Sequence, residues 1–462
     1  MKILSTEEAS QGSTQIHLIS GSISKFVEVN GVAELHIGYG AKKPLTQRKI
    51  TTFLRKIVVL AKQHKIKTIT LDWKELRKIA DKNISDKKLA EIAAVAWSMA
   101  NFDFTVYKKE PEGGFESVEE ITVLGAPTND GFARGDLIAT EINSCRALSN
   151  TPGGDMTPRI LAEVARIIAK DTHVHVDVLG VQEMKREGMG AVLGIAKGSE
   201  LEPQFIVMEY WGAAKTKKPV VLVGKGVTFD TGGLQIKPGD HMYEMHMDMS
   251  GGAAVMHAVV LAAKLKLKVN VIALVPAVEN AASGTAVRPG DILKSLSGRT
   301  IEVLHTDAEG RVILADAITY SKRYDPKIVV DVATLTGAAL VALGTQANAF
   351  MTNKDSLIPA LQELGEESGD YLWPFPAWEE YEDMIKGNFA DVCNIPANGN
   401  SRYGGVIAGG MFLREFAKDL SCPWVHIDMA PRMTANSNEF LAKGAVGAPV
   451  RLLLGIIEEY GR

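Results

Sequence analysis

Four acidic residues stand in glycine-rich stretches in the middle of the chain, at Asp230, Asp248, Asp307 and Glu309. An acid that stands alone in such a position is most often a helix cap or a turn residue. Together the four carry the negative charge that two divalent cations neutralise, and carboxylate oxygens are ligands that hard cations prefer. The set therefore favours a site that holds two metal ions and activates water for hydrolysis.

The densest part of this set is the segment HTDAEGR at residues 305–311. Asp307 and Glu309 are two residues apart, so on an extended segment both side chains leave the same face and can grip one cation between them. Arg311 continues that register, directly before an apolar run. We interpret this segment as one half of a site.

The other half is predicted at residues 223–238, VGKGVTFDTGGLQIKP, where an apolar strand runs into a glycine-rich loop. Lys225, Asp230 and Lys237 are the ionisable groups of this stretch, and its glycines let the backbone approach a ligand closely. A phosphate-binding loop is disfavoured, because Lys237 is followed by proline rather than by serine or threonine. Asp248 stands just ahead of a predicted helix, where free backbone amides favour a carboxylate.

Other kinds of catalytic site find less support in the sequence. His241 and His246 are five residues apart and fit neither HExxH nor HxxEH, so we expect neither to be a metal ligand. There is no GxSxG motif, and no cysteine has the local context of a nucleophile, which disfavours covalent catalysis. Cys145, Cys393 and Cys422 form no CxxC pair, a usage typical of a reducing compartment.

The elements that must position these residues follow from the hydrophobic pattern. Apolar runs alternate with amphipathic stretches, which is typical of an α/β fold with a mixed sheet covered by helices. Before residue 127 we predict strands at residues 15–19, 33–37, 68–71, 104–107 and 121–124, and helices at residues 47–64 and 86–99. After residue 152 we predict strands at residues 174–178, 205–210, 220–228, 268–275, 301–304, 328–332 and 424–427, and helices at residues 158–169, 251–264, 311–323 and 405–418.

Length and turn signals suggest two domains, because 462 residues exceed what one hydrophobic core usually holds. We predict a small N-terminal α/β domain at residues 1–127. A linker at residues 128–151 opens with the turn signal TNDG and continues as a connecting helix at residues 136–148. A larger C-terminal catalytic domain with a central mixed sheet flanked by helices occupies residues 152–462.

Charge and hydropathy disfavour several classes of partner. The formal net charge of −4 gives no electrostatic reason to expect a nucleic acid or a membrane surface. The N-terminus becomes polar too early for a signal peptide, and the apolar stretches are too short to span a bilayer. We therefore expect a soluble, cytoplasmic protein.

These motifs resemble those of the leucine aminopeptidase (cytosol aminopeptidase) family. Residues 305–311 match the family's NTDAEGR signature except at the first position, and residues 223–238 match its VGKGxTFDxGGxxxKP loop. Further matches are DMSGGAA at residues 248–254, EN at 279–280, RPGD at 288–291 and ATLTGA at 333–338. The matches extend over residues 143–453, whereas the part before residue 127 contains no motif that we can match.

The resemblance implies a set of site residues for two divalent cations, Mn²⁺ or Zn²⁺. Lys225, Asp230, Asp248 and Glu309 would bind one cation, and Asp230, Asp307 and Glu309 the other, so that Asp230 and Glu309 bridge. Lys225 would bind as a neutral amine, its pKa depressed by burial and by the cations. The expected activity is hydrolysis of the N-terminal residue of a peptide by a water that the two metals activate.

The family likeness also implies the remaining catalytic groups. Lys237 would stabilise the oxyanion, and Arg311 would hold a bicarbonate ion that serves as base and proton shuttle. The free α-amine of the substrate would bind beside Lys225 and Asp248. A pocket for Leu, Met and other apolar side chains would be formed by residues that include two methionines, namely Met245, Thr334, Leu335, Gly337, Ala430 and Met433. His305 replaces the family's usual asparagine. The resemblance places this position near the substrate residue that leaves on cleavage, so the histidine could change the preference for that residue.

Further expectations concern assembly and alternatives. The resemblance implies a homohexamer of two stacked trimers. An alternative is a hexameric family member with an additional DNA-binding or scaffold role, which the net acidity does not favour. A two-metal phosphoesterase would explain the carboxylates, but it leaves Lys225 and the match at residues 333–338 unexplained.

Overall fold

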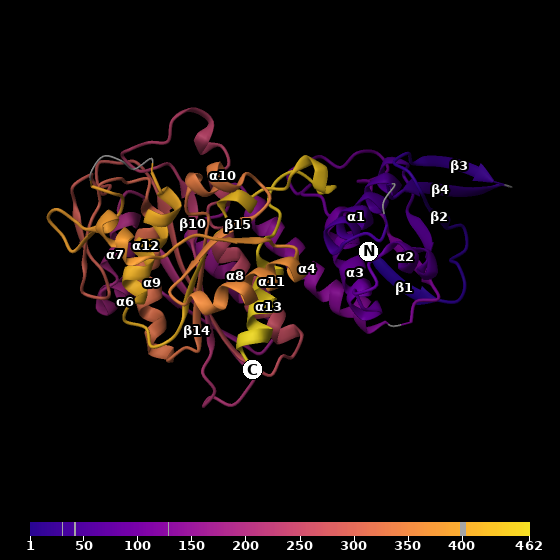
Figure 1. Ribbon diagram of the computed structural model, residues 1–462. Coiled ribbons are helices and arrows are strands. Elements are labelled where there is room, and N and C mark those ends of the chain that lie inside the picture. Colours follow the sequence, from indigo (N-terminus) through magenta and orange to yellow (C-terminus); the bar gives the residue numbers. More distant parts are fainter. Residues whose placement is uncertain (30, 41–42, 128, 398–402) are drawn as a thin grey trace. The chain divides into compact units, whose positions relative to one another are not determined.

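The computed structural model describes residues 1–462 apart from residues 30, 41–42, 128 and 398–402 (Figure 1). It is an α/β protein with helices packed on mixed sheets, as the sequence predicts. The chain forms two compact units, one of Met1–Asn143 with Ala435–Lys443 and one of Ser144–Thr434 with Gly444–Arg462. No helix within the described residues is both long and apolar enough to cross a membrane.

The first unit is built on a six-stranded sheet in the order β1-β6-β5-β2-β4-β3. Neighbouring strands are parallel except for the antiparallel pair of β3 and β4. Helix α1 buries the apolar stripe that the sequence shows at helical spacing. The elements are β1 (Lys2–Thr6), β2 (Thr14–Ile19), β3 (Lys25–Val29), β4 (Val32–Gly38), α1 (Gln47–Gln63), β5 (Thr68–Asp72), α2 (Trp73–Ile79), α3 (Asp86–Asn101) and β6 (Glu120–Leu124).

Two local predictions in this region are wrong. The strand expected at residues 104–107 is a loop that enters a turn, and its β-prone Val106 and Tyr107 are exposed rather than packed on a sheet. The connecting helix α4 (Asp130–Asn150) begins at the residues expected to form the turn; Thr128 lies outside the described residues. Gly131 lies in this helix where α3 packs closely against it: a Cβ atom there would lie 2.4 Å from the Lys87 carbonyl oxygen, so the position requires glycine.

The second unit is organised around a nine-stranded mixed sheet in the order β16-β15-β18-β14-β9-β11-β8-β7, with β10 paired to β11. Strands β18, β14, β9 and β11 are parallel neighbours. Its strands are β7 (Val174–Leu179), β8 (Gln204–Trp211), β9 (Val220–Gly224), β10 (Gly226–Asp230), β11 (Asn270–Asn280), β14 (Ile328–Ala333), β15 (Asn348–Thr352), β16 (Leu372–Pro374) and β18 (Trp424–Asp428). A small sheet contains β12 (Ile292–Lys294), β13 (Thr300–Glu302) and β17 (Val392–Cys393).

Helices cover both faces of this sheet (Figure 1). Helices α8 and α13 pack together on one side, and α7, α9 and α12 pack together on the other. The helices are α5 (Pro158–Ala169), α6 (Val181–Glu187), α7 (Gly190–Ala196), α8 (Ser250–Lys264), α9 (Glu309–Ser321), α10 (Gly337–Leu343), α11 (Ile358–Ser368), α12 (Gly405–Ala417) and α13 (Val450–Tyr460). Short 3-10 helices include η1 (Gly239–Met242), η2 (Met245–Met247) and η6 (Ala430–Arg432).

The apolar run predicted as one strand at residues 220–228 is in fact two strands, β9 and β10, which separate at Lys225. Both pair with the long strand β11, β9 with its first half and β10 with its second half. The Lys225 amide donates to the Val332 carbonyl oxygen of β14 at 3.0 Å. This change of partner places Lys225 at the carboxyl end of β9, where ligand sites form in sheets of parallel strands.

Candidate active site

A cavity of about 820 Å³ opens at the carboxyl ends of the parallel strands of the second unit. The fourteen residues singled out in the sequence all line it, although they are spread over more than two hundred positions. They are Lys225, Asp230, Lys237, Met245, Asp248, His305, Asp307, Glu309, Arg311, Thr334, Leu335, Gly337, Ala430 and Met433. The structure thus brings the two halves of the predicted site together.

Strand ends and helix starts position the charged groups. Asp230 is the last residue of β10, and Asp248 lies between η2 and the start of α8. Asp307 lies in a turn, and Glu309 is the first residue of α9, so the segment is not extended as expected. The side chains converge nevertheless: Asp230, Asp307 and Glu309 each offer an oxygen within 4.8 Å of the others.

Two lysines, the buried Lys225 and the half-buried Lys237, lie between these carboxylates. Lys225 Nζ is 2.7 Å from Asp248 Oδ2 and 2.8 Å from Glu309 Oε1. Lys237 Nζ is 2.7 Å from Asp230 Oδ2 and 2.5 Å from Asp307 Oδ1. Each ammonium group thus bridges two acids, in the way that a cation shared by the same oxygens would.

The charge of this cluster perturbs its titration. Burial raises the pKa of Asp248 to about 8, with Glu309 and Asp230 adding to the effect and Lys225 opposing it. Burial alone would lower the pKa of Lys225, but Asp248, Glu309 and Asp230 together raise it. The carboxylates alone therefore keep Lys225 protonated, and a neutral amine at this position requires bound cations to displace its proton.

Several oxygens of the cluster suit a metal ion better than a hydrogen-bond donor. Asp248 Oδ2, Asp307 Oδ1 and Glu309 Oε1 are buried and accept no hydrogen bond of good geometry from any described residue, although each lies beside a lysine. Four carboxylates face two ammonium groups, so the cluster retains excess negative charge. Oxygen-rich ligands of this charge fit two divalent cations, with Lys225 contributing a nitrogen.

Close packing restricts the positions of the side chains in the carboxylate cluster. A Cβ atom at Gly310 would lie 2.7 Å from Lys225 Nζ, so the first turn of α9 has room for the lysine only because residue 310 is glycine. Asn280 donates from Nδ2 to Asp230 Oδ1 at 2.8 Å and to the Thr306 carbonyl oxygen at 3.1 Å. Asn280 therefore fixes Asp230 relative to the turn that contains Asp307.

Asn394 is a positioning residue that the sequence did not reveal. Its Oδ1 accepts from the amides of Leu304 and His305, and its Nδ2 donates to the His305 carbonyl oxygen at 2.6 Å. Its own carbonyl oxygen accepts from Arg311 Nη1 at 2.7 Å. Because Asn394 is more than eighty positions from these partners, no local motif could have identified it.

The guanidinium of Arg311 is buried and has an N–H donor that is available to a ligand. Burial lowers its pKa to about 10, against the opposing effects of Glu309 and Asp428, so the guanidinium stays charged at neutral pH. Arg311 Nε is buried and has no hydrogen-bond partner among the residues that the structure describes, and the side chain lines the cavity. A buried guanidinium with a free donor is suited to hold a small planar anion.

An apolar pocket adjoins the charged cluster. Met245, Leu335, Ala430 and Met433 line it together with Thr334 and Gly337. Asp428, the last residue of β18, holds two of its loops: it accepts from the Leu335 amide at 3.0 Å and the Ala430 amide at 3.2 Å. Asp428 was not predicted, although its place directly after the predicted strand at residues 424–427 was an available signal.

His305 lines the cavity and shapes the turn that carries Asp307. Its Nδ1 accepts from the Asp307 amide at 3.3 Å, which places the ring proton of the neutral imidazole on Nε2. An asparagine side chain forms the same contact to the amide two residues on. His305 therefore preserves the local turn while presenting a larger ring to the cavity.

The two histidines expected not to bind metal lie on short helices, His241 on η1 and His246 on η2. His241 lines the cavity, but neither histidine belongs to the potential metal-binding groups found among the described residues. The three cysteines are free thiols, and none lines the cavity.

Comparisons with known proteins find a matching family and similar solved structures. A family model described as "Cytosol aminopeptidase family, catalytic domain" matches residues 143–454. A probable cytosol aminopeptidase of Syntrophotalea carbinolica is 49% identical over 361 residues, covering 77% of this chain and 71% of the relative. One of Azoarcus sp. is 47% identical over 320 residues, covering 69% of this chain and 62% of the relative, so the match spans less than two thirds of that protein. The solved structure of the bottromycin maturation enzyme BotP in complex with Mn has a TM-score of 0.87 and 27% identity, covering 98% of this chain and 100% of that chain.

Proposed function

The chain belongs to the cytosol aminopeptidase family, and we propose that it is a metal-dependent aminopeptidase that removes the N-terminal residue from peptides. The observation that carries this proposal is one cavity in which four carboxylates and two lysines adjoin an apolar pocket. The charged part suits cations and a substrate amine, and the apolar part suits the first side chain of a peptide.

The proposed cofactors are two divalent cations. Lys225, Asp230, Asp248 and Glu309 would hold one, and Asp230, Asp307 and Glu309 the other. BotP, which this chain resembles, has been solved with Mn, which supports Mn²⁺ as the first cation to test, with Zn²⁺ as the alternative. When bound, the pair supplies a Lewis acid for the scissile carbonyl and lowers the pKa of water.

The residues of the chain supply the rest of the proposed chemistry. Asp248 places a buried carboxylate where a free α-amine can bind, which would restrict cleavage to the N-terminal residue. Lys237 carries a positive charge beside the carboxylates and would stabilise the oxyanion that forms on the carbonyl. Arg311, with its free Nε, would hold a bicarbonate ion that accepts and returns the proton.

The apolar pocket sets the proposed substrate preference. Met245 and Met433 are flexible and polarisable, and Gly337 and Ala430 leave space, so Leu, Met and similar side chains fit best. We further propose that the protein acts in cytoplasmic peptide turnover as a homohexamer. We retain residues 1–127 and 152–462 as the proposed domains, with 128–151 as the linker between them.

The proposed function predicts loss and recovery of activity with metal. Chelator-treated protein should lose hydrolysis of leucine amide, and added Mn²⁺ or Zn²⁺ should restore it, because the carboxylates alone cannot activate water. N-acetylated leucine amide is the matched control, since it lacks the free amine that Asp248 is proposed to bind. Failure of both metals to restore hydrolysis, or equal hydrolysis of the acetylated compound, would disprove the proposal.

His305 provides a second prediction about this activity. His305→Asn keeps an acceptor for the Asp307 amide, so leucine amide hydrolysis should stay within about threefold of wild type. His305→Ala removes that acceptor and should lower kcat/KM about fivefold, since a lost hydrogen bond costs about 1 kcal/mol. The measurement is kcat/KM over a panel of Leu-X dipeptides. Equal values for both variants would show that the Asp307 contact has no role.

A further inference from the structure

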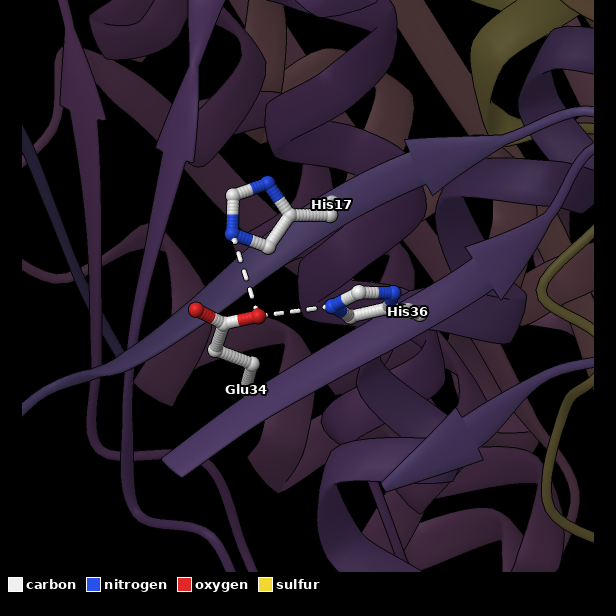
Figure 2. A group of neighbouring side chains, drawn as sticks. All are labelled: His17, Glu34 and His36. Carbon is white, nitrogen blue, oxygen red and sulfur yellow. Dashed lines mark hydrogen bonds and ion pairs between the residues drawn. The ribbon is translucent and has the colours of Figure 1, made fainter. Parts of the chain in front are cut away.

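A group of potential metal ligands lies in the first unit, at His17 on β2 and at Glu34 and His36 on β4 (Figure 2). Each side chain offers one ligand atom, and these atoms all lie within 4.8 Å of one another. The group shares no residue with the cavity of the second unit.

Strand pairing explains why these three side chains meet. Strands β2 and β4 are parallel neighbours, and in their register His17 is opposite His36. Glu34 is two residues before His36 on the same strand, so both side chains leave the same face of the sheet. The three side chains are therefore held by the backbone of a central strand pair, not by a flexible loop.

Distances within the group are close to those of a metal site. His36 Nε2 is 2.7 Å and His17 Nε2 is 3.7 Å from the same Glu34 oxygen, Oε2, and both contacts converge in Figure 2. Ligands that share one tetrahedral Zn²⁺ at about 2.0–2.1 Å lie about 3.3–3.4 Å apart, which falls between the two observed values. The side chains are partly exposed, His17 by 41%, His36 by 23% and Glu34 by 18%, so an ion can reach them.

A second carboxylate lies behind His17. Glu75 of α2 places Oε1 3.8 Å from His17 Nδ1, the ring nitrogen that faces away from Glu34. Its other oxygen accepts from the Leu18 amide at 3.0 Å, which fixes the carboxylate. Histidines that bind metals usually direct the second ring nitrogen at such a carboxylate, which orients the ring and increases its basicity.

We propose that His17, Glu34 and His36 bind one transition-metal cation of the zinc class, with Glu75 as the carboxylate that orients His17. Two imidazole nitrogens and one carboxylate oxygen favour Zn²⁺, Co²⁺, Ni²⁺ or Cu²⁺ over Mg²⁺ or Mn²⁺. Three protein ligands leave the fourth position of a tetrahedral ion to water. The ion would join β2 to β4 independently of the proposed aminopeptidase activity.

The test uses the full chain with Asp307→Asn and Glu309→Gln, which weaken binding at the carboxylate cluster. After chelator treatment, this protein should bind one Zn²⁺ in calorimetry, and Co²⁺ should give the visible absorption of a four-coordinate nitrogen–oxygen site. Adding His36→Ala should weaken Zn²⁺ binding at least about tenfold and abolish the Co²⁺ spectrum, and Glu75→Gln should weaken binding about tenfold.

Controls separate a metal site from an ordinary ion pair. His64→Ala, in the same unit but outside the group, should leave Zn²⁺ binding unchanged, and circular dichroism of each metal-free variant checks its folding. Glu34→Gln keeps the size of the side chain and should also weaken binding. The proposal is overturned if stoichiometric Zn²⁺ binding is absent, or if it persists unchanged in folded His36→Ala and Glu34→Gln proteins.

Discussion

Glu309→Gln should lower kcat/KM for leucine amide by at least about 10³-fold and reduce the Mn²⁺ retained by the carboxylate cluster. The substitution keeps the shape of the side chain but removes a charge that lies 2.8 Å from Lys225 Nζ and within reach of Asp230 and Asp307. Glu309 is one of the two proposed ligands that both cations would share, with Asp230, so both cations should depend on it. Loss of several kcal/mol of metal assistance corresponds to a rate factor of this size.

Steady-state kinetics and metal analysis of the same preparation measure this effect. Glu363→Gln is the matched control, because Glu363 is an exposed glutamate on α11 and lies outside the cavity. It should retain both activity and Mn²⁺. If the Glu309→Gln protein keeps wild-type metal content and turnover, Glu309 is not a metal ligand.

Lys237→Met should lower kcat by about 10²- to 10³-fold, the usual cost of losing one group that stabilises an oxyanion. Metal binding should persist or become tighter, because the Lys237 ammonium competes with cations for Asp230 and Asp307 at 2.7 and 2.5 Å. This combination of lost turnover and retained metal distinguishes Lys237 from the proposed ligands. KM should change much less than kcat.

The matched control for Lys237 is Lys354→Met, which removes an exposed lysine of the same unit outside the cavity. Calorimetry with Mn²⁺ and kinetics on leucine amide are needed for both variants. A Lys237→Met protein that no longer binds Mn²⁺ would make Lys237 a part of the metal site. One that retains full kcat would exclude the proposed oxyanion role.

Much of the fold could be predicted because its signals are local. The apolar runs at β9, β14 and β18 and the amphipathic pattern of α1 each depend on a few neighbouring residues. The division of residues 220–228 into β9 and β10 could not be predicted in this way, since it depends on the long partner β11. The wrong strand at residues 104–107 has the same origin, because β-prone residues form a strand only where a sheet edge receives them.

The site residues divide in the same way, into those that a local sequence motif reveals and those that depend on contacts between residues far apart in the sequence. Asp307 and Glu309 were found from their types and spacing, but their convergence comes from a turn and a helix start rather than from an extended segment. The role of Asn394 depends on contacts with residues far away in the sequence. The group of His17, Glu34 and His36 depends on the pairing of β2 with β4. Such residues carry chemistry, but only the register of the folded chain brings them together.

The most direct test of the two-metal proposal is to titrate Mn²⁺ into chelator-treated protein while bound metal and leucine amide hydrolysis are measured together. The His17→Ala, His36→Ala background removes the separate histidine group from the stoichiometry. We predict that turnover saturates when the carboxylate cluster holds two Mn²⁺ per chain. Saturation with one Mn²⁺ per chain, or full Mn²⁺ binding without hydrolysis, would contradict it.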